Sequence, residues 1–148
     1  MSKETFTRHE IREKALQALF PLDFNTDLTK KDAITNALEL EHGEMVSEDG
    51  EDFVPVYLDV LVGGVCEKKE ELDQLVQSHL GKGWSIQRIA KLDLIILRMA
   101  IFEMKYVADV PDTVALNEAL ELTKKYSDDT SRKFVNGVLS NVMKDLQQ

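Results

Sequence analysis

The most apolar stretch of the chain is SIQRIAKLDLIILRMAIFEMK, residues 85–105. Its apolar side chains cover most of the circumference of a helix, whereas a surface helix carries a single apolar stripe. A helix of this kind must be contacted from several sides, so we expect it at the centre of the fold. The apolar positions are Ile86, Ile89, Ala90, Leu94, Ile95, Leu97, Ile101, Phe102 and Met104.

Helices are predicted on both sides of this segment, because apolar residues recur there at intervals of three and four. No long alternation of Val, Ile and Thr supports a strand. We therefore predict an all-α fold of about seven helices in two packed helical lobes. The predicted helices run from about Arg8 to Phe20, after a cap at Thr29, from about Phe53 to Glu67, through Leu72 to Leu80, over 85–105, from near Pro111, and from about Ser131 to Leu146.

Three features predict where these elements end. Pro21 is expected to help end the first helix. Residues 41–52 carry six acids and two glycines, which is typical of a solvated loop. The turn Gly81-Lys82-Gly83 is predicted to divide the chain into an N-terminal lobe, 1–80, and a C-terminal lobe, 81–148, within one compact domain overall.

Composition excludes several classes of function. A chain of 148 residues with 43% apolar residues can bury a core, so wholesale disorder is excluded. The single cysteine, Cys66, cannot form an internal disulfide, and a cytoplasmic location fits best. The sequence has no phosphate-binding glycine loop and no metal-ligand spacing, so we expect neither cofactor nor metal, no catalytic residues and no enzymatic activity. No membrane segment is expected.

The net charge of −9 does not exclude a nucleic-acid ligand, because the negative charge is concentrated in one part of the chain. Residues 41–80 carry two basic and eleven acidic side chains, whereas residues 1–40 have a net charge of −1 and residues 81–148 of +1. Both ends can therefore present local basic patches to a polyanion.

Three charged residues on predicted apolar faces need a partner. On the first helix, Arg8 and Arg12 lie on one side beside apolar residues. On the central helix, Asp93 has the same awkward placement. A structural ion pair or a backbone hydrogen bond explains such residues as well as a ligand does, and we expect Arg12 and Asp93 to pair with each other.

A second basic cluster flanks the turn before the last helix. Lys124-Lys125 precede this turn and Arg132-Lys133 follow it, with Ser131 and Phe134 close by. A basic turn is ordinarily solvated surface, and Phe134 also fits a core position. Cations, hydroxyls and aromatic rings together are nevertheless what single-stranded RNA requires.

Several segments of the chain resemble the NusB family of bacterial transcription antitermination factors. The resemblance covers most of the chain in order and spacing. It is carried by REKALQALF at 12–20, LDLIILRMAIFE at 92–103, DVP at 109–111, ALNEALEL at 115–122 and KFVNGVL at 133–139.

The resemblance implies a function that composition alone does not. It implies binding to the single-stranded boxA RNA of ribosomal RNA operon transcripts, together with ribosomal protein NusE, in an RNA polymerase antitermination complex. A homodimer is a further partner compatible with the sequence. The RNA-binding residues that it implies are Arg8, His9, Arg12, Phe20, Thr130, Ser131, Lys133 and Phe134.

Two departures from the family pattern bear on this expectation. Glu10 interrupts what is often a denser arginine run, and Thr130 stands where an acid can occur. The first implies weak RNA affinity for the chain alone. Two other interpretations fit the residues. One is the RNA-binding domain fused to ribosomal RNA cytosine methyltransferases, which we set aside because we expect no catalytic domain here. The other is a helical adaptor that binds only protein.

Overall fold

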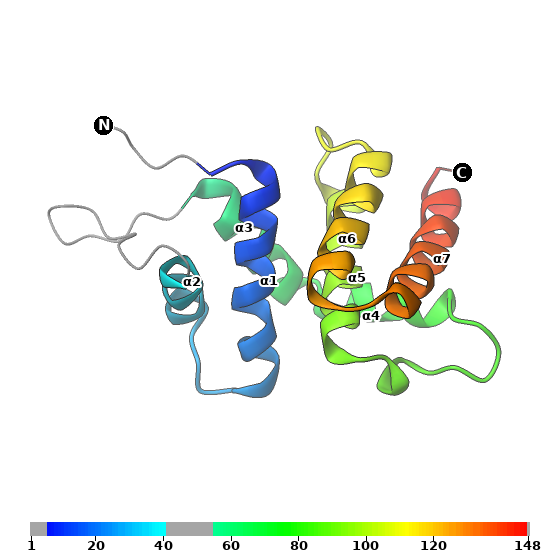
Figure 1. Cartoon of the computed structure of the whole chain (residues 1–148), viewed down its shortest axis with the longest axis horizontal. Coiled ribbons are helices and arrows are strands. Elements are labelled where there is room, and N and C mark those ends of the chain that lie inside the picture. The colour runs from blue at the N-terminus through cyan, green and yellow to red at the C-terminus, as the bar shows by residue number, and fades with distance from the viewer. Residues whose placement is uncertain (1–5, 41–54, 148) are drawn as a thin grey trace, which may run out of the picture. The chain divides into compact units, whose positions relative to one another are not determined.

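A computed structural model of the chain describes residues 6–40 and 55–147 (Figure 1). Within these residues every regular element is helical, as predicted. The elements are α1 (Arg8–Phe24), α2 (Lys30–Glu39), α3 (Val56–Glu67), α4 (Lys69–Ser78), the 3-10 turn η1 (Ile86–Arg88), α5 (Lys91–Tyr106), α6 (Asp112–Tyr126) and α7 (Asp129–Leu146). The predicted acidic loop at 41–52 lies outside the described residues.

The chain divides into two compact units, residues 1–64 and 65–148. The sequence prediction set this division at the turn 81–83, after the fourth helix. Instead α4 groups with the C-terminal helices, because it packs against α5 and α7. A bidentate ion pair joins α4 to α5: the Arg98 guanidinium donates to both oxygens of Asp73, at 2.7 and 3.1 Å.

In the first unit α1 packs against α2, and both helices begin at a threonine cap. The Thr7 hydroxyl accepts the Glu10 N–H, and the Glu10 carboxylate accepts the Thr7 N–H in return. At α2, the Thr29 hydroxyl accepts the Asp32 N–H at 3.0 Å, which confirms the predicted cap.

The prediction that α1 ends near Phe20 is wrong, because the helix continues through Pro21 to Phe24. A proline removes one helical hydrogen bond, but its fixed φ is compatible with the helix. The Pro21 carbonyl accepts the Asn25 N–H at 3.1 Å, which closes the final turn. Phe20 and Phe24 lie four residues apart on the same turn. Their rings make an edge contact, with the ring centroids 5.0 Å apart.

In the second unit α5 is the central helix, packed against α4, α6 and α7 (Figure 1). All residues from Asp93 to Glu103 are buried, including Ile95 and Leu97, which are at most 1% exposed. The predicted central position of this segment is therefore confirmed.

The prediction of one continuous helix from Ser85 is wrong. Ile86–Arg88 form a 3-10 turn, Ile89 and Ala90 are extended, and α5 begins only at Lys91. The Gln77 side chain of α4 holds the start of this turn, because its Oε1 accepts the Ile86 N–H at 2.9 Å and its Nε2 donates to the Trp84 carbonyl at 3.4 Å. These backbone groups are thus paired with α4 and not within a helix.

The ends of α6 and α7 follow the sequence closely. Pro111 immediately precedes α6, where its missing N–H costs nothing. Asp128 caps α7, since its carboxylate accepts the Ser131 N–H at 2.8 Å. None of the described helices is long and apolar enough to cross a membrane.

The C-terminal end of α4 is tied to the end of α7 through a histidine. His79 Nδ1 donates to the Leu75 carbonyl at 2.7 Å, and Nε2 donates to the Asp145 carboxylate at 2.5 Å. Burial lowers the pKa of His79, but the hydrogen bonds to Leu75 and Asp145 outweigh burial and raise this pKa above its ordinary value. The charged imidazole is therefore the form that stabilises the fold.

This pair predicts a pH-dependent stability. The stabilisation from a raised histidine pKa is fully present below the unfolded-state pKa of about 6.5 and is lost as the pH rises through the folded-state pKa. We expect the Asp145→Asn variant to have a lower free energy of unfolding than the wild-type chain. The margin between the two should be largest between about pH 5 and 6.5 and should decrease at higher pH. Urea unfolding across this pH range measures the margin.

The control is Glu121→Gln, which removes an exposed carboxylate of α6 and should show a margin independent of pH. An Asp145→Asn margin that grows with rising pH would contradict the assignment of a charged His79.

Candidate nucleic-acid interface

The start of α1 presents two of the predicted RNA-binding residues. The Arg8 guanidinium lies 3.7 Å from the centre of the Tyr57 ring of α3, which holds its planar group flat against the aromatic face. Both Arg8 and His9 are exposed. Glu10, which interrupts the basic run, is the acid of the capping box and so has a structural function at this helix start.

Arg12 is buried, with 4% of its surface exposed, whereas Arg8 and His9 are exposed. It interacts with other groups of the chain, as a buried cation must. Arg12 could contact RNA only if its side chain became exposed to solvent. The predicted pairing with Asp93 joins residues of different units and stays a prediction.

Phe20 is the fourth predicted residue of the first unit, and 38% of its surface is exposed. Its edge contact with Phe24, itself 63% exposed, makes an aromatic pair near the end of α1. Arg8 is thus the first residue of α1 and Phe20 lies one turn before its end, and both are accessible to solvent.

The other four predicted residues lie in the first two turns of α7. Thr130 and Lys133 are exposed, whereas Ser131 and Phe134 are half-buried. The Ser131 hydroxyl donates to Asp93 Oδ2 at 2.6 Å, which attaches the start of α7 to the start of α5. Asp93 Oδ1 is buried and has no hydrogen-bond partner in the part of the chain that the structure describes.

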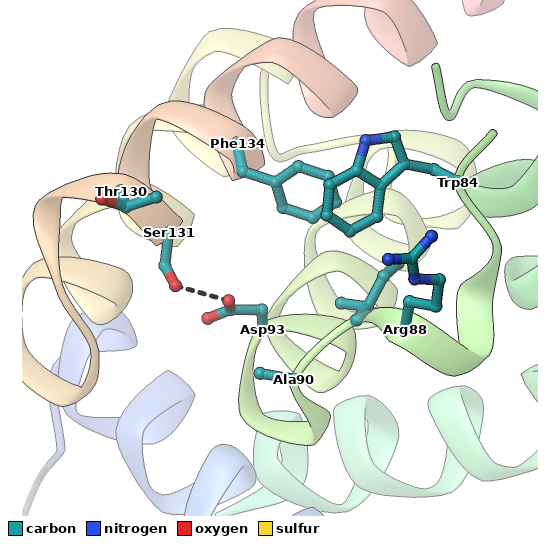
Figure 2. Close-up of a pocket in the computed structure, with 8 residues that line it drawn as sticks. Trp84, Arg88, Ala90, Asp93, Thr130, Ser131 and Phe134 are labelled. Carbon is teal, nitrogen blue, oxygen red and sulfur yellow. Dashed lines mark hydrogen bonds between the residues drawn. The ribbon is translucent and has the colours of Figure 1, made fainter. Parts of the chain in front are cut away.

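Three of these α7 residues line a pocket of about 210 Å³ (Figure 2). The Phe134 ring lies against the Trp84 indole, with centroids 6.0 Å apart and planes at 38°. The remaining wall comes from the segment between α4 and α5 and from the first turn of α5. The lining residues are Trp84, Arg88, Ile89, Ala90, Asp93, Thr130, Ser131 and Phe134.

Trp84 and Arg88 are the functional candidates that the sequence analysis missed. Their positions depend on the break before α5, which the apolar periodicity of 85–105 concealed. The available signal was the position of Trp84 directly after the Gly81–Gly83 turn, outside any helical stripe. Gly83 supplies a positive φ of 86° there, a conformation that glycine adopts without strain.

The side chains that line the pocket suit an organic ligand better than a metal ion. Across residues 6–40 and 55–147, no group of three or more His, Cys, Asp and Glu side chains could hold a metal ion. The pocket instead combines two aromatic rings, the cation of Arg88, two hydroxyls and one carboxylate. These are groups that contact bases and phosphates.

Comparison with known proteins identifies the family. The model of the NusB family matches residues 9–144. This chain belongs to the NusB family. The transcription antitermination protein NusB of Enterococcus faecalis is 72% identical to it over 146 residues, which cover 99% of this chain and 95% of that protein. The NusB protein of Lactiplantibacillus plantarum is 51% identical, covering 95% and 97% of the two chains.

Solved NusB structures have the same fold. The NusB of T. maritima superposes with a TM-score of 0.80 at 26% identity, covering 96% of this chain and 94% of the other. A NusB crystallised with NusE in complex with dsRNA gives a TM-score of 0.76 at 25% identity, covering 93% and 96%. The predicted family resemblance and the all-helical NusB-like fold are thus confirmed.

The two hydroxyls at the start of α7 in this NusB-family chain should differ in their effect on stability. Ser131→Ala removes the donor to a buried carboxylate and should cost about 1–3 kcal/mol. Thr130→Ala, one residue away on the exposed side, should change stability by no more than about 0.5 kcal/mol. Urea unfolding of the two variants measures both effects, and equal losses would show that the Asp93 contact does not stabilise the fold.

Proposed function

We propose that this chain binds the single-stranded boxA RNA of ribosomal RNA operon transcripts together with NusE and thereby suppresses transcription termination. The observation that carries the proposal is the cluster at the start of α7, where an exposed cation, Lys133, adjoins a pocket with hydroxyl and aromatic walls. The family supports the same conclusion, since relatives up to 72% identical are transcription antitermination proteins.

Local charge favours RNA at this surface in spite of the net charge of −9. Residues 81–148 have a net charge of +1, and exposed cations flank the turn between α6 and α7. Lys124 and Lys125 lie in the last turn of α6, while Arg132 and Lys133 lie in the first turns of α7. Phosphates close to this turn meet those cations, whereas repulsion by acids farther away than about 8–10 Å is screened by salt.

A basic patch of this size supplies only part of the binding energy. Asp128 and Asp129 lie beside the cations at the start of α7, and Asp128 is needed as its cap. A second RNA-binding partner would supply the missing phosphate contacts. A NusB relative crystallised with NusE and dsRNA supports NusE as that partner. We extend the proposal to action within the RNA polymerase antitermination complex in the cytoplasm, and to a homodimer as the alternative partner of the free chain.

Arg8 and Lys133 should contact phosphates directly. Arg8→Ala and Lys133→Ala should each weaken the binding of a boxA oligonucleotide, whatever its sequence, because each removes one cation. Each should also reduce the slope of log K against log salt by about 0.7, the value for one phosphate contact to a single strand. Fluorescence anisotropy of labelled RNA at several salt concentrations measures the slopes.

Lys144→Ala is the matched control, because it removes an exposed lysine near the far end of α7. Its slope should equal that of the wild type. Unchanged slopes in both test variants would place the RNA elsewhere on the molecule. A wild-type chain that binds no RNA but captures NusE would instead establish the helical adaptor function that binds only protein.

A further inference from the structure

We propose that the pocket between Trp84, Arg88 and the start of α7 receives one unstacked nucleobase of the bound RNA, with a preference for cytosine or guanine. This inference rests on the proposed RNA-binding function and names a subsite within it. The pocket volume of about 210 Å³ is below the 300–1,000 Å³ of sites for drug-sized ligands. One planar ring system suits this volume better than a peptide segment does.

The aromatic wall is built for stacking. Trp84 keeps 49% of its surface in solvent although its indole is large and apolar. Because the Trp84 and Phe134 rings contact each other at 6.0 Å and are tilted by 38°, they form one continuous aromatic surface without a slot between them. A base can therefore stack on this surface from the pocket side, and stacking of this kind tolerates any base.

The wall is also held in place before any ligand arrives. The Trp84 carbonyl accepts from Gln77 of α4, and the Trp84 N–H donates to the Gly81 carbonyl at 3.1 Å. The Arg88 guanidinium lies 5.3 Å from the indole centre and donates to the Gly83 carbonyl at 3.4 Å. A rigid platform loses little conformational freedom on binding, which favours affinity.

The polar groups of the pocket discriminate among bases. The Ser131 hydroxyl gives its proton to Asp93 Oδ2, so the Ser131 oxygen presents acceptor lone pairs to the pocket. Arg88, on the other side of the pocket in Figure 2, presents only donors. A base with an amino group toward Ser131 and a ring carbonyl toward Arg88 satisfies both ends. Cytosine and guanine carry both groups, whereas uracil has no amino group.

The pocket also adjoins the cations that would hold the RNA backbone. Lys133 is exposed and lies three residues after Thr130, which lines the pocket, so these two side chains are neighbours on the surface of α7. A phosphate bound there leaves its base within reach of the pocket. This continuity with the proposed RNA surface is the reason to favour a nucleobase over the side chain of a protein partner.

The chain provides its own spectroscopic probe, because Trp84 is its one tryptophan. We expect a short boxA RNA to quench Trp84 fluorescence in the full-length protein as the base stacks. Trp84→Leu should weaken binding of the labelled RNA about 5- to 100-fold, the loss of one base stack, and leave the salt slope unchanged. Trp84→Phe should retain most of the affinity, since a ring remains.

A scan of abasic RNAs identifies the nucleotide. One abasic position should weaken binding as much as Trp84→Leu does, and the two changes combined should cost no more than either alone. At that position cytosine or guanine should bind about 5- to 100-fold more tightly than uracil. Tyr106→Leu, which removes an aromatic side chain that is 40% exposed elsewhere in the same unit, is the control and should leave RNA affinity unchanged.

The possible failures are distinguishable. If RNA binds with the expected salt slope but neither the fluorescence nor any abasic position reports on Trp84, the subsite is wrong and the proposed function stands. Quenching by NusE without RNA, and none by RNA alone, would assign the pocket to the protein partner and overturn the inference. Absence of any RNA binding would overturn the proposed function and the subsite together.

Discussion

The hydrogen bond between Ser131 and Asp93 is the interaction on which the candidate site depends. Asp93 lies in the first turn of the central helix α5, where it is 4% exposed, and a carboxylate so placed requires a donor. Ser131 provides the donor at 2.6 Å. Because Ser131 belongs to the first turn of α7, the same bond fixes this turn beside the pocket and positions Thr130 and Phe134 on its wall.

Two further side chains connect α4 to the region around the pocket. Arg98, in the middle of α5, is paired with Asp73 of α4, and Gln77 of α4 holds the backbone of Trp84 and Ile86. Each of these contacts stabilises the second unit, and the Gln77 contact also shapes the pocket. The same contacts thus pack α5 and shape the site. A substitution of one of these contact residues will therefore change both the stability of the fold and the geometry of the pocket.

Much of this fold could be predicted from the sequence, because apolar periodicity depends on local chemistry. The helices, the Thr29 cap and the burial of Ile95 and Leu97 were predictable for this reason. The break before α5 was not, because Ile89 and Ala90 leave the helical conformation inside a segment whose apolar periodicity is continuous. The continuation of α1 past Pro21 could not be predicted from the residue type, because proline disfavours a helix interior although its fixed φ is compatible with one.

The site was predictable in part, for the same physical reasons. The residues of α7 were found because cations, hydroxyls and a ring cluster within a few positions of the sequence. Trp84 and Arg88 reach the same pocket through tertiary structure alone, from a segment more than forty residues away in the chain. The spacing of Thr7 and Glu10 is that of a capping box, so the structural function of Glu10 could have been predicted from the sequence. The apolar side of the first helix likewise indicated that Arg12 is buried.

The central claim is that this chain is an RNA-binding factor that works with NusE. Titration of labelled boxA RNA with the chain alone, with NusE alone and with an equimolar mixture tests this claim most directly, at a single salt concentration. The few exposed cations beside the acids of α7 predict weak binding by the chain alone. The mixture should bind more tightly than either protein, because the two sets of phosphate contacts act on one RNA. Equal affinity for the mixture and for the better single protein would contradict the account.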